Sequence, residues 1–229
     1  MMSLLCRLFL ASVFILVGCN PANQEPESEV VQEAQLSLKS ESLQKAIAKG
    51  DLDTVNTLLS QDPALANAEN GSQYSPLALA ILRKQVAIAK LLIEAGARVD
   101  FRDSKKRTLV HLAVERNLPT LIAVLAKKGA KLNEWDSAGW TPMHWAAAKD
   151  QFRMLKELSK AGADIQARSI RGGSILHEAA ASGSEEVIQL LIELGVDPNM
   201  IATEGDTALD IARTFNNKAA IHLLTQNQQ

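Results

Sequence analysis

The sequence predicts an all-α solenoid of about six helix-turn-helix units, and two observations support this fold class. The first is a spacing of 33 residues that recurs along the chain without interruption, which is the signature of stacked repeats. The second is composition, because hydrophobic residues make up 47% of the chain but aromatic residues only 4%. Aliphatic and small side chains suit helices, whose axes can then pack closely. The positions in phase are Ser75, Thr108, Thr141, Ser174 and Thr207, then Gly96, Gly129, Gly162 and Gly195, and then Leu59, Leu92, Leu125, Leu158, Leu191 and Leu224.

Each unit contains signals for two helices and a turn. Thr141 provides a hydroxyl that can cap a helix, and Pro142 follows at the first helical position, where a missing N–H costs nothing. Small residues such as Ala146 then permit close approach of the next helix. In the following unit, a second helix carries Leu191 on its apolar face, and Gly195 supplies the left-handed conformation that ends it.

Two segments resemble the ankyrin repeat closely. The resemblance extends over about residues 40–224 and implies six units, which begin near residues 40, 73, 106, 139, 172 and 205 of a domain that spans residues 40–229. It also implies hairpin loops that project between the units and a concave face that binds protein partners. The two segments are Gly139-Trp140-Thr141-Pro142-Met143-His144-Trp145-Ala146-Ala147, similar to T-P-L-H-x-A-A, and Lys160-Ala161-Gly162-Ala163-Asp164-Ile165, similar to G-A-D-V-N.

Three positions depart from the pattern. Gln44 stands where later units have an apolar residue, and Gly50 comes one residue early, so the first helix is expected to be shifted by one residue. Terminal repeats have only one neighbour and commonly carry such changes. Glu157 stands where other units have Leu or Val, which predicts less regular packing around it.

Residues 1–18 are predicted to be a bacterial lipoprotein signal peptide. Arg7 precedes an apolar run that is too short to span a bilayer comfortably as a helix. The run leads into Leu16-Val17-Gly18-Cys19, which resembles a lipobox, the motif in which cleavage occurs just before a cysteine that is acylated. The alternative is an ordinary secretory signal or a membrane anchor that happens to contain Cys19.

Acylation of Cys19 would hold the mature chain on a lipid bilayer, since acyl chains contribute about 0.8 kcal/mol per buried methylene. Residues 19–39 are then the lipidated N-terminus and a flexible acidic linker, in which four glutamates against one lysine give a net charge of -3. In the familiar lipoprotein sorting system, Asp after the cysteine favours the inner membrane, and Asn20 stands there instead. The expected location is the bacterial cell envelope, lipid-anchored and facing the periplasm, with the outer membrane favoured over the inner membrane.

The sequence does not favour nucleic-acid binding or catalysis. From Glu41 onward there are 22 basic and 22 acidic residues, whereas nucleic-acid binding needs a basic surface. The only cysteines are Cys6 and Cys19, so no disulfide or cysteine metal site is expected in the repeats. The sequence contains no recognisable nucleophile motif, phosphate-binding glycine loop or zinc-binding motif. We expect no enzyme activity, no cofactor and no small-molecule substrate.

Three histidines in phase, His111, His144 and His177, suggest a metal site at first sight. Stacked repeats lie roughly 10 Å apart, however, and each imidazole would have to come within about 2 Å of one metal ion. The histidines also match the one in the family's T-P-L-H segment, which usually bonds the neighbouring hairpin. A structural role is therefore predicted, and no metal site.

The candidate partner-binding site is centred on three tryptophans. Trp135, Trp140 and Trp145 are the only tryptophans in the chain, and Trp and Arg are enriched in binding hot spots. The family register places the first two on a projecting hairpin and the third on the concave side of a helix. The alternative is that the indoles pack between hairpins and stabilise the stack. Four residues at matching positions of neighbouring units complete the candidate site: Leu112, Arg102, Arg107 and Arg168. Arg102 and Arg107 also belong to a basic hairpin tip, which either contacts an acidic partner or is simply solvated.

Two functions fit these expectations. The first is a membrane-tethered periplasmic lipoprotein that binds a protein partner of unknown identity through the concave face, as an adaptor or scaffold. The second is an inhibitor or immunity-type protein that blocks a periplasmic hydrolase or toxin with the same surface. They differ in outcome, because an inhibitor abolishes the partner's activity and a scaffold leaves it intact.

Overall fold

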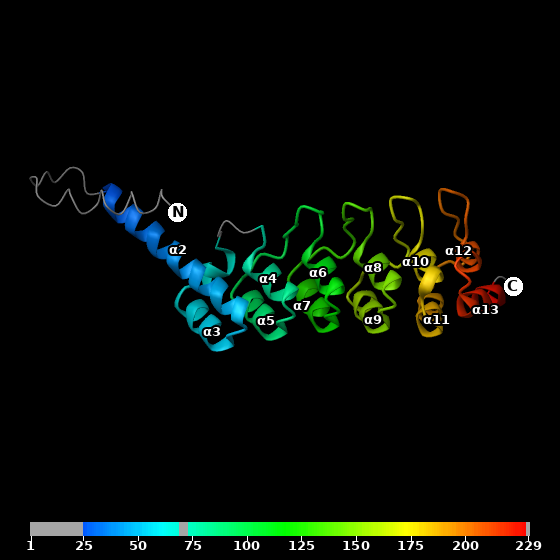
Figure 1. The fold of residues 1–229 in the computed structure, drawn as a ribbon, viewed down its shortest axis with the longest axis horizontal. Coiled ribbons are helices and arrows are strands. Elements are labelled where there is room, and N and C mark those ends of the chain that lie inside the picture. Colours follow the sequence, from blue (N-terminus) through cyan, green and yellow to red (C-terminus); the bar gives the residue numbers. More distant parts are fainter. Residues whose placement is uncertain (1–24, 69–72, 228–229) are drawn as a thin grey trace, which may run out of the picture. The chain divides into compact units, whose positions relative to one another are not determined.

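The computed structural model describes residues 25–68 and 73–227, and the chain divides into two units, residues 1–38 and residues 39–229. The predicted signal peptide and Cys19 lie outside the described residues. Over the described ranges the chain forms twelve α-helices, two short 3-10 helices and three isolated β-bridges, without a strand. The all-α fold of six stacked helix pairs is confirmed (Figure 1).

The helix pairs repeat along residues 39–229. First helices form one row, second helices form another, and hairpin loops project from the first row on one side (Figure 1). The first helix of the opening pair is the C-terminal part of α2 (Glu25–Lys49), and the second is α3 (Leu52–Gln61). The 3-10 helix η2 (Pro63–Asn67) follows α3. The later first helices are α4 (Pro76–Leu82), α6 (Leu109–Glu115), α8 (Pro142–Ala148), α10 (Ile175–Ser182) and α12 (Ala208–Thr214). The later second helices are α5 (Val86–Glu94), η3 (Pro119–Leu121) with α7 (Ile122–Lys127), α9 (Phe152–Lys160), α11 (Glu185–Glu193) and α13 (Lys218–Gln226).

The flexible linker predicted over residues 19–39 is corrected to helix from Glu25 onward, because α2 begins there. Pro26 lies in the first turn, where its missing N–H is harmless, and no glycine or proline follows before Gly50. Glu, Gln, Ala, Leu and Lys, which favour helix, make up much of the segment. An acidic, polar composition was therefore a poor guide to chain flexibility over residues 25–39.

Hydroxyl side chains begin the first helices, as the sequence predicts. Ser75 Oγ accepts a hydrogen bond from Ala78 N at 3.2 Å, and Pro76 occupies the first turn of α4. In α6, α8 and α10, the hydroxyl and a histidine three residues later form a reciprocal capping pair, and in α12 Asp210 replaces the histidine. These bonds satisfy N–H groups that have no partner inside the helix. After α11, Gly195 has a φ of +90°, which is the predicted left-handed conformation.

Leucines in phase fill the space between successive units. Leu92, Leu125, Leu158 and Leu191, from the second helices, are each 0% exposed. Each unit buries its apolar face against its neighbours, so the buried residues form one continuous core along the array. The stability of every unit therefore depends on the units beside it.

The predicted shift of the first helix is confirmed. Gly50 has a φ of +76°, one residue earlier in its unit than Lys84, whose φ is +60°. Leu43 is consequently fully buried, whereas Gln44 is half-buried and its Nε2 has no hydrogen-bond partner in the described part of the chain. The shift lets a leucine take the core position that the sequence register gave to the glutamine.

Glu157 is accommodated at the edge of the core. Its side chain is 33% exposed, and Lys160 Nζ lies 2.8 Å from its Oε1. Leu58 and Leu91, at the matching positions, are also only half-buried. A carboxylate at this position keeps contact with water, so the packing of Leu158 beside it is undisturbed.

Adjacent hairpins are joined to one another by main-chain hydrogen bonds. One N–H near each tip donates to a carbonyl of the preceding hairpin, so the hairpins form a ladder along the array. The bonds are Ser137 N to Lys105 O at 2.8 Å, Ile170 N to Gly139 O at 2.9 Å, and Thr203 N to Arg171 O at 3.1 Å.

The three histidines add a second link between units. Each Nδ1 lies 2.8–3.0 Å from the hydroxyl that begins its own helix, and each Nε2 lies 3.0–3.3 Å from a carbonyl oxygen of the next unit. A carbonyl oxygen only accepts, so Nε2 donates and Nδ1 accepts from the hydroxyl. The predicted structural role is confirmed. The Nε2 partners are Trp140 O for His111, Gly173 O for His144 and Asp206 O for His177.

These bonds require neutral imidazoles. Burial lowers the pKa of His144 to about 4, although the bond to the Gly173 carbonyl acts in the opposite direction. Burial likewise lowers the pKa of His111. The unfolded chain therefore binds protons on these residues more readily than the folded chain does, so their contribution to stability is present above pH 6.5 and is lost as the pH falls.

A His144→Gln variant should reveal this linkage. The free energy of unfolding of the wild-type protein should exceed that of the variant at pH 7.5, and the difference should shrink by up to about 3 kcal/mol between pH 6.5 and pH 4. Chemical denaturation of the wild-type protein and the variant at several pH values measures the two free energies of unfolding. A difference that stays constant with pH would show that His144 is not held neutral by the fold.

Candidate functional site

The candidate site lies on the hairpin face, which we define as the hairpins together with the first helices α4, α6, α8, α10 and α12 (Figure 1). The three tryptophans all lie on this face, but each has its own surroundings. Among the described residues, the ring contacts found are those of Tyr74 with Phe101 and of His111 with Trp145, so the three indoles do not stack on one another.

Trp135 is the most exposed of the three. Half of its surface, 50%, is accessible, while its Nε1 donates to Arg168 O at 3.1 Å. Arg168 Nη1 in turn donates to Ile201 O at 3.2 Å in the next hairpin. The polar ends of both side chains therefore extend the hairpin ladder, while half of the Trp135 surface stays accessible to a partner.

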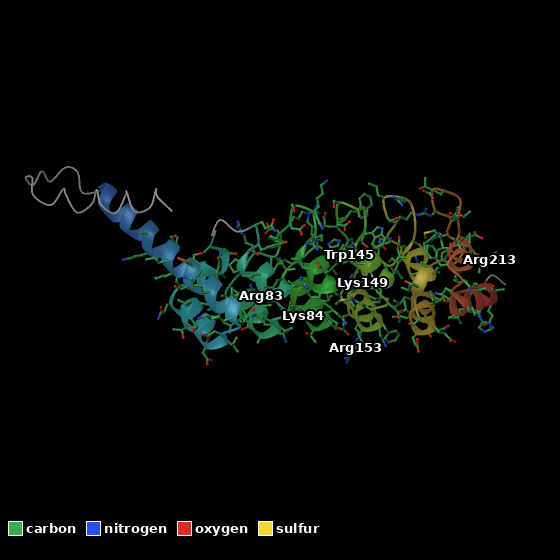
Figure 2. All side chains as sticks on the ribbon, in the orientation of Figure 1. Arg83, Lys84, Trp145, Lys149, Arg153 and Arg213 are labelled. Atoms are coloured by element: carbon green, nitrogen blue, oxygen red, sulfur yellow. The ribbon has the colours of Figure 1, made fainter. Side chains whose placement is uncertain are left out.

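Trp145 is fixed within α8. Its Nε1 donates to Asp136 Oδ2 at 3.0 Å, and its ring meets His111 edge-on at a centroid distance of 6.1 Å. Lys149, one turn later, places Nζ 5.6 Å from the indole centroid, close enough for a cation–π contact (Figure 2). Packing and partner binding were alternatives for this residue, and its contacts favour packing.

Arg107 is not a free hairpin cation. Its guanidinium bonds Asp103 through Nε at 2.7 Å and also pairs with Glu115 of α6, and its side chain is only 11% exposed. Burial alone would lower the pKa of Arg107, but the hydrogen bond and charge of Asp103 raise it on balance. The prediction that Arg107 contacts a partner is therefore corrected to a structural role, because the ion pairs tie the hairpin to the helix.

Two other candidates also have partners within the chain. Arg102 pairs with Glu134 on the neighbouring unit and remains partly exposed. Leu112 is 0% exposed and belongs to the core, so its assignment to the binding face is wrong. At the matching positions, Leu79 one unit earlier and Trp145 one unit later both stay partly exposed.

Trp140 borders a cavity of about 400 Å³ that is open to solvent. We call this cavity the Glu178 pocket. It is lined by the three hairpins that lead into α8, α10 and α12, and by helices α10 and α12. Its apolar lining includes Trp140, Ala181, Ile211 and Phe215, and its charged lining is Arg171, Glu178, Glu204 and Asp206.

Glu178 contributes a carboxylate to this pocket from α10. It is half-buried, and no hydrogen bond or ion pair joins it to another residue in the described part of the chain. Burial raises the pKa of Glu178 to about 7, and the charge of Arg171 opposes this shift without reversing it. Glu178 was not among the site residues predicted from the sequence. A signal was present, however, because the 33-residue register aligns it with Leu79, Leu112, Trp145 and Ile211, an otherwise apolar row.

Residues 25–68 and 73–227 contain no group of three or more His, Cys, Asp or Glu side chains arranged to hold a metal ion. No helix among them is both long enough and apolar enough to cross a membrane.

The stacked helix pairs, the hairpin ladder and the histidine links define a helical repeat protein. The model of the ankyrin repeat matches residues 72–104, and models of ankyrin repeats in three and in many copies match residues 95–169 and 176–225. The chain belongs to the ankyrin-repeat family. Ankyrin repeats imply a role in protein–protein interaction, and such domains are typically not enzymes. A search of curated proteins found no match to the chain.

The ion pairs of Arg107 should matter for stability. We expect Arg107→Met to lower the free energy of unfolding by about 2 kcal/mol, because it leaves the Asp103 carboxylate without its charged partner. Thermal and chemical denaturation measure this loss. Lys105→Met, at the exposed tip of the same hairpin, is the matched control and should change stability by less than about 0.5 kcal/mol. Equal effects of the two substitutions would contradict the structural role.

Proposed function

We propose that this protein binds a protein partner through its hairpin face while a lipid on Cys19 holds it in the bacterial envelope, facing the periplasm. The family supplies the general role, since ankyrin repeats imply protein–protein interaction. The observation that carries the choice of surface is the Glu178 pocket, where Trp140 is partly exposed and Phe215 is 62% exposed. Aromatic side chains beside a cavity are the usual anchors of protein interfaces.

The rest of the hairpin face is largely occupied by contacts within the chain. Lys149 lies over Trp145 (Figure 2). Arg83 Nη1 donates to Ala48 O at 3.1 Å, and Arg107 is held by two carboxylates. Groups that already have partners gain little from a new one, because the old interaction must first be broken. This favours the C-terminal part of the face, around α10 and α12, as the main contact area.

The tether is proposed from the sequence alone. The lipobox-like Leu16-Val17-Gly18-Cys19 supports acylation, and Asn20 after the cysteine favours the outer membrane over the inner membrane. An adaptor or scaffold role follows from combining a permanent anchor with a binding face. Binding would then concentrate the partner at the membrane without altering it.

Replacement of Trp140 tests the binding face. Trp140→Ala should weaken capture of an envelope protein about tenfold, because loss of a hot-spot aromatic typically costs more than about 1.4 kcal/mol. The main-chain carbonyl that accepts from His111 is retained, so helicity by circular dichroism should be unchanged. Phe152→Ala, an exposed aromatic residue on the second-helix row, is the control and should bind normally. Unchanged capture by Trp140→Ala would place the interface elsewhere.

Replacement of Cys19 tests the tether. Cys19→Ser should abolish acylation, so the protein accumulates as an unprocessed or soluble chain in fractionated cells. Cys6→Ser changes the only other cysteine and should leave the mature protein in the membrane fraction. Mature, membrane-extracted Cys19→Ser protein would rule out the lipid anchor.

A further inference from the structure

We propose that the Glu178 pocket receives a cationic side chain, arginine or lysine, of the protein partner, whose charge pairs with the Glu178 carboxylate. This inference rests on the proposed function, since it specifies the chemistry of the partner at the same face. It depends on three properties of the pocket: an unpaired carboxylate, apolar walls, and an excess of negative charge.

The carboxylate is available because no hydrogen bond or ion pair joins it to another described residue. Glu178 lies in the middle of α10, and even a Cβ added at Gly173 of the adjoining hairpin would lie 3.9 Å from Glu178 Oε1. The absence of a side chain there leaves space beside the carboxylate. The carboxylate is therefore partly removed from water without receiving a protein donor in return, which is unfavourable unless a ligand supplies one.

The walls suit the aliphatic part of a long cationic side chain. Trp140 borders one side, and Ile211 of α12 and Phe215, directly after α12, border the other. Arginine and lysine are amphipathic, so their methylene stems can lie along such walls while the charged head meets a carboxylate. An indole at the rim would add a cation–π contribution.

The charge of the pocket selects a cation. Glu178, Glu204 and Asp206 face Arg171, with His177 also in the lining, so three carboxylates oppose one guanidinium. Arg171 is exposed and makes no ion pair with a described residue, and its charge does not bring the Glu178 pKa back to the usual range. An anionic side chain would meet net repulsion here, and a neutral one would leave the Glu178 carboxylate unpaired.

Binding of three short peptides to the folded protein tests the charge preference of the pocket. The probes are acetyl-Leu-Arg-Leu-amide, its uncharged citrulline counterpart, and acetyl-Leu-Glu-Leu-amide, titrated at pH 7.5 and followed by NMR of the Trp140 indole and the Glu178 carboxyl carbon. Only the arginine peptide should bind, and Glu178→Gln should weaken its binding about tenfold. Its binding to the wild-type protein should also strengthen about tenfold between pH 6 and pH 8, because the proton on Glu178 competes with the cation. Glu178→Gln should lose this dependence on pH.

Glu186→Gln, at an exposed position of α11, is the matched control and should bind like the wild-type protein. The thermal melting temperature of each variant shows that it is folded. Equal binding of the citrulline peptide, preferential binding of the glutamate peptide, or unchanged binding by Glu178→Gln would each overturn the proposal. If Trp140→Ala no longer captures its envelope partner but no peptide binds the wild-type protein, the hairpin face is still the binding surface. That result rejects only the proposal that a cationic side chain of the partner enters the Glu178 pocket.

Discussion

The bond between a histidine and the carbonyl of the next unit is the constraint on which the array depends. In each case one imidazole meets the hydroxyl that begins its own helix and a main-chain oxygen 29 residues further along the chain. One side chain thereby fixes the start of a helix, the position of a hairpin and the spacing of two units. The apolar core alone would not do this, since leucine contacts are non-directional and tolerate sliding.

The same requirement for satisfied polar groups explains why most of the predicted binding residues are structural. Hairpins project from the core and have few apolar contacts of their own, so they depend on hydrogen bonds and ion pairs for order. Arg107, Arg168, Trp135 and Trp145 all use their polar ends for this purpose. Residue types that are enriched in interfaces are therefore also those that hold hairpins in place, and type alone does not separate the two roles.

Glu178 differs because its surroundings offer burial without a partner. In the rest of the apolar row, the matching positions of other units carry leucine, tryptophan or isoleucine, which would fill the same space without an electrostatic cost. A charge at this position gives up some stability, and such departures from local consistency concentrate where a protein has a function. The fold supplies the platform, while the specificity resides in a few side chains on one part of it.

The sequence by itself determined the fold class, the six units and their register, because each unit repeats the same local signals at a fixed step. Hydroxyl, proline and glycine act within a few residues of their own position, and a histidine at a constant offset meets the same neighbour each time. Even the one-residue shift at Gly50 could be read from the sequence, since it breaks that step. The helix over residues 25–39 was not predicted, because the acidic, polar composition of this segment indicates a flexible linker even though its residues have high helix propensity.

Only the tertiary structure decided which candidate residues remain available. Leu79 and Leu112 share one register position and one residue type, yet Leu112 is enclosed and Leu79 is partly exposed, because the adjoining units determine burial. Arg107 has carboxylates 4 residues before it and 8 residues after it, and the fold brings both to one guanidinium. The Glu178 pocket is lined by three hairpins and two helices, so it exists only once neighbouring units have stacked. The repeat register follows from local sequence signals, whereas the exposure of a side chain and its hydrogen-bond or ion-pair partners depend on which residues of the next unit lie beside it.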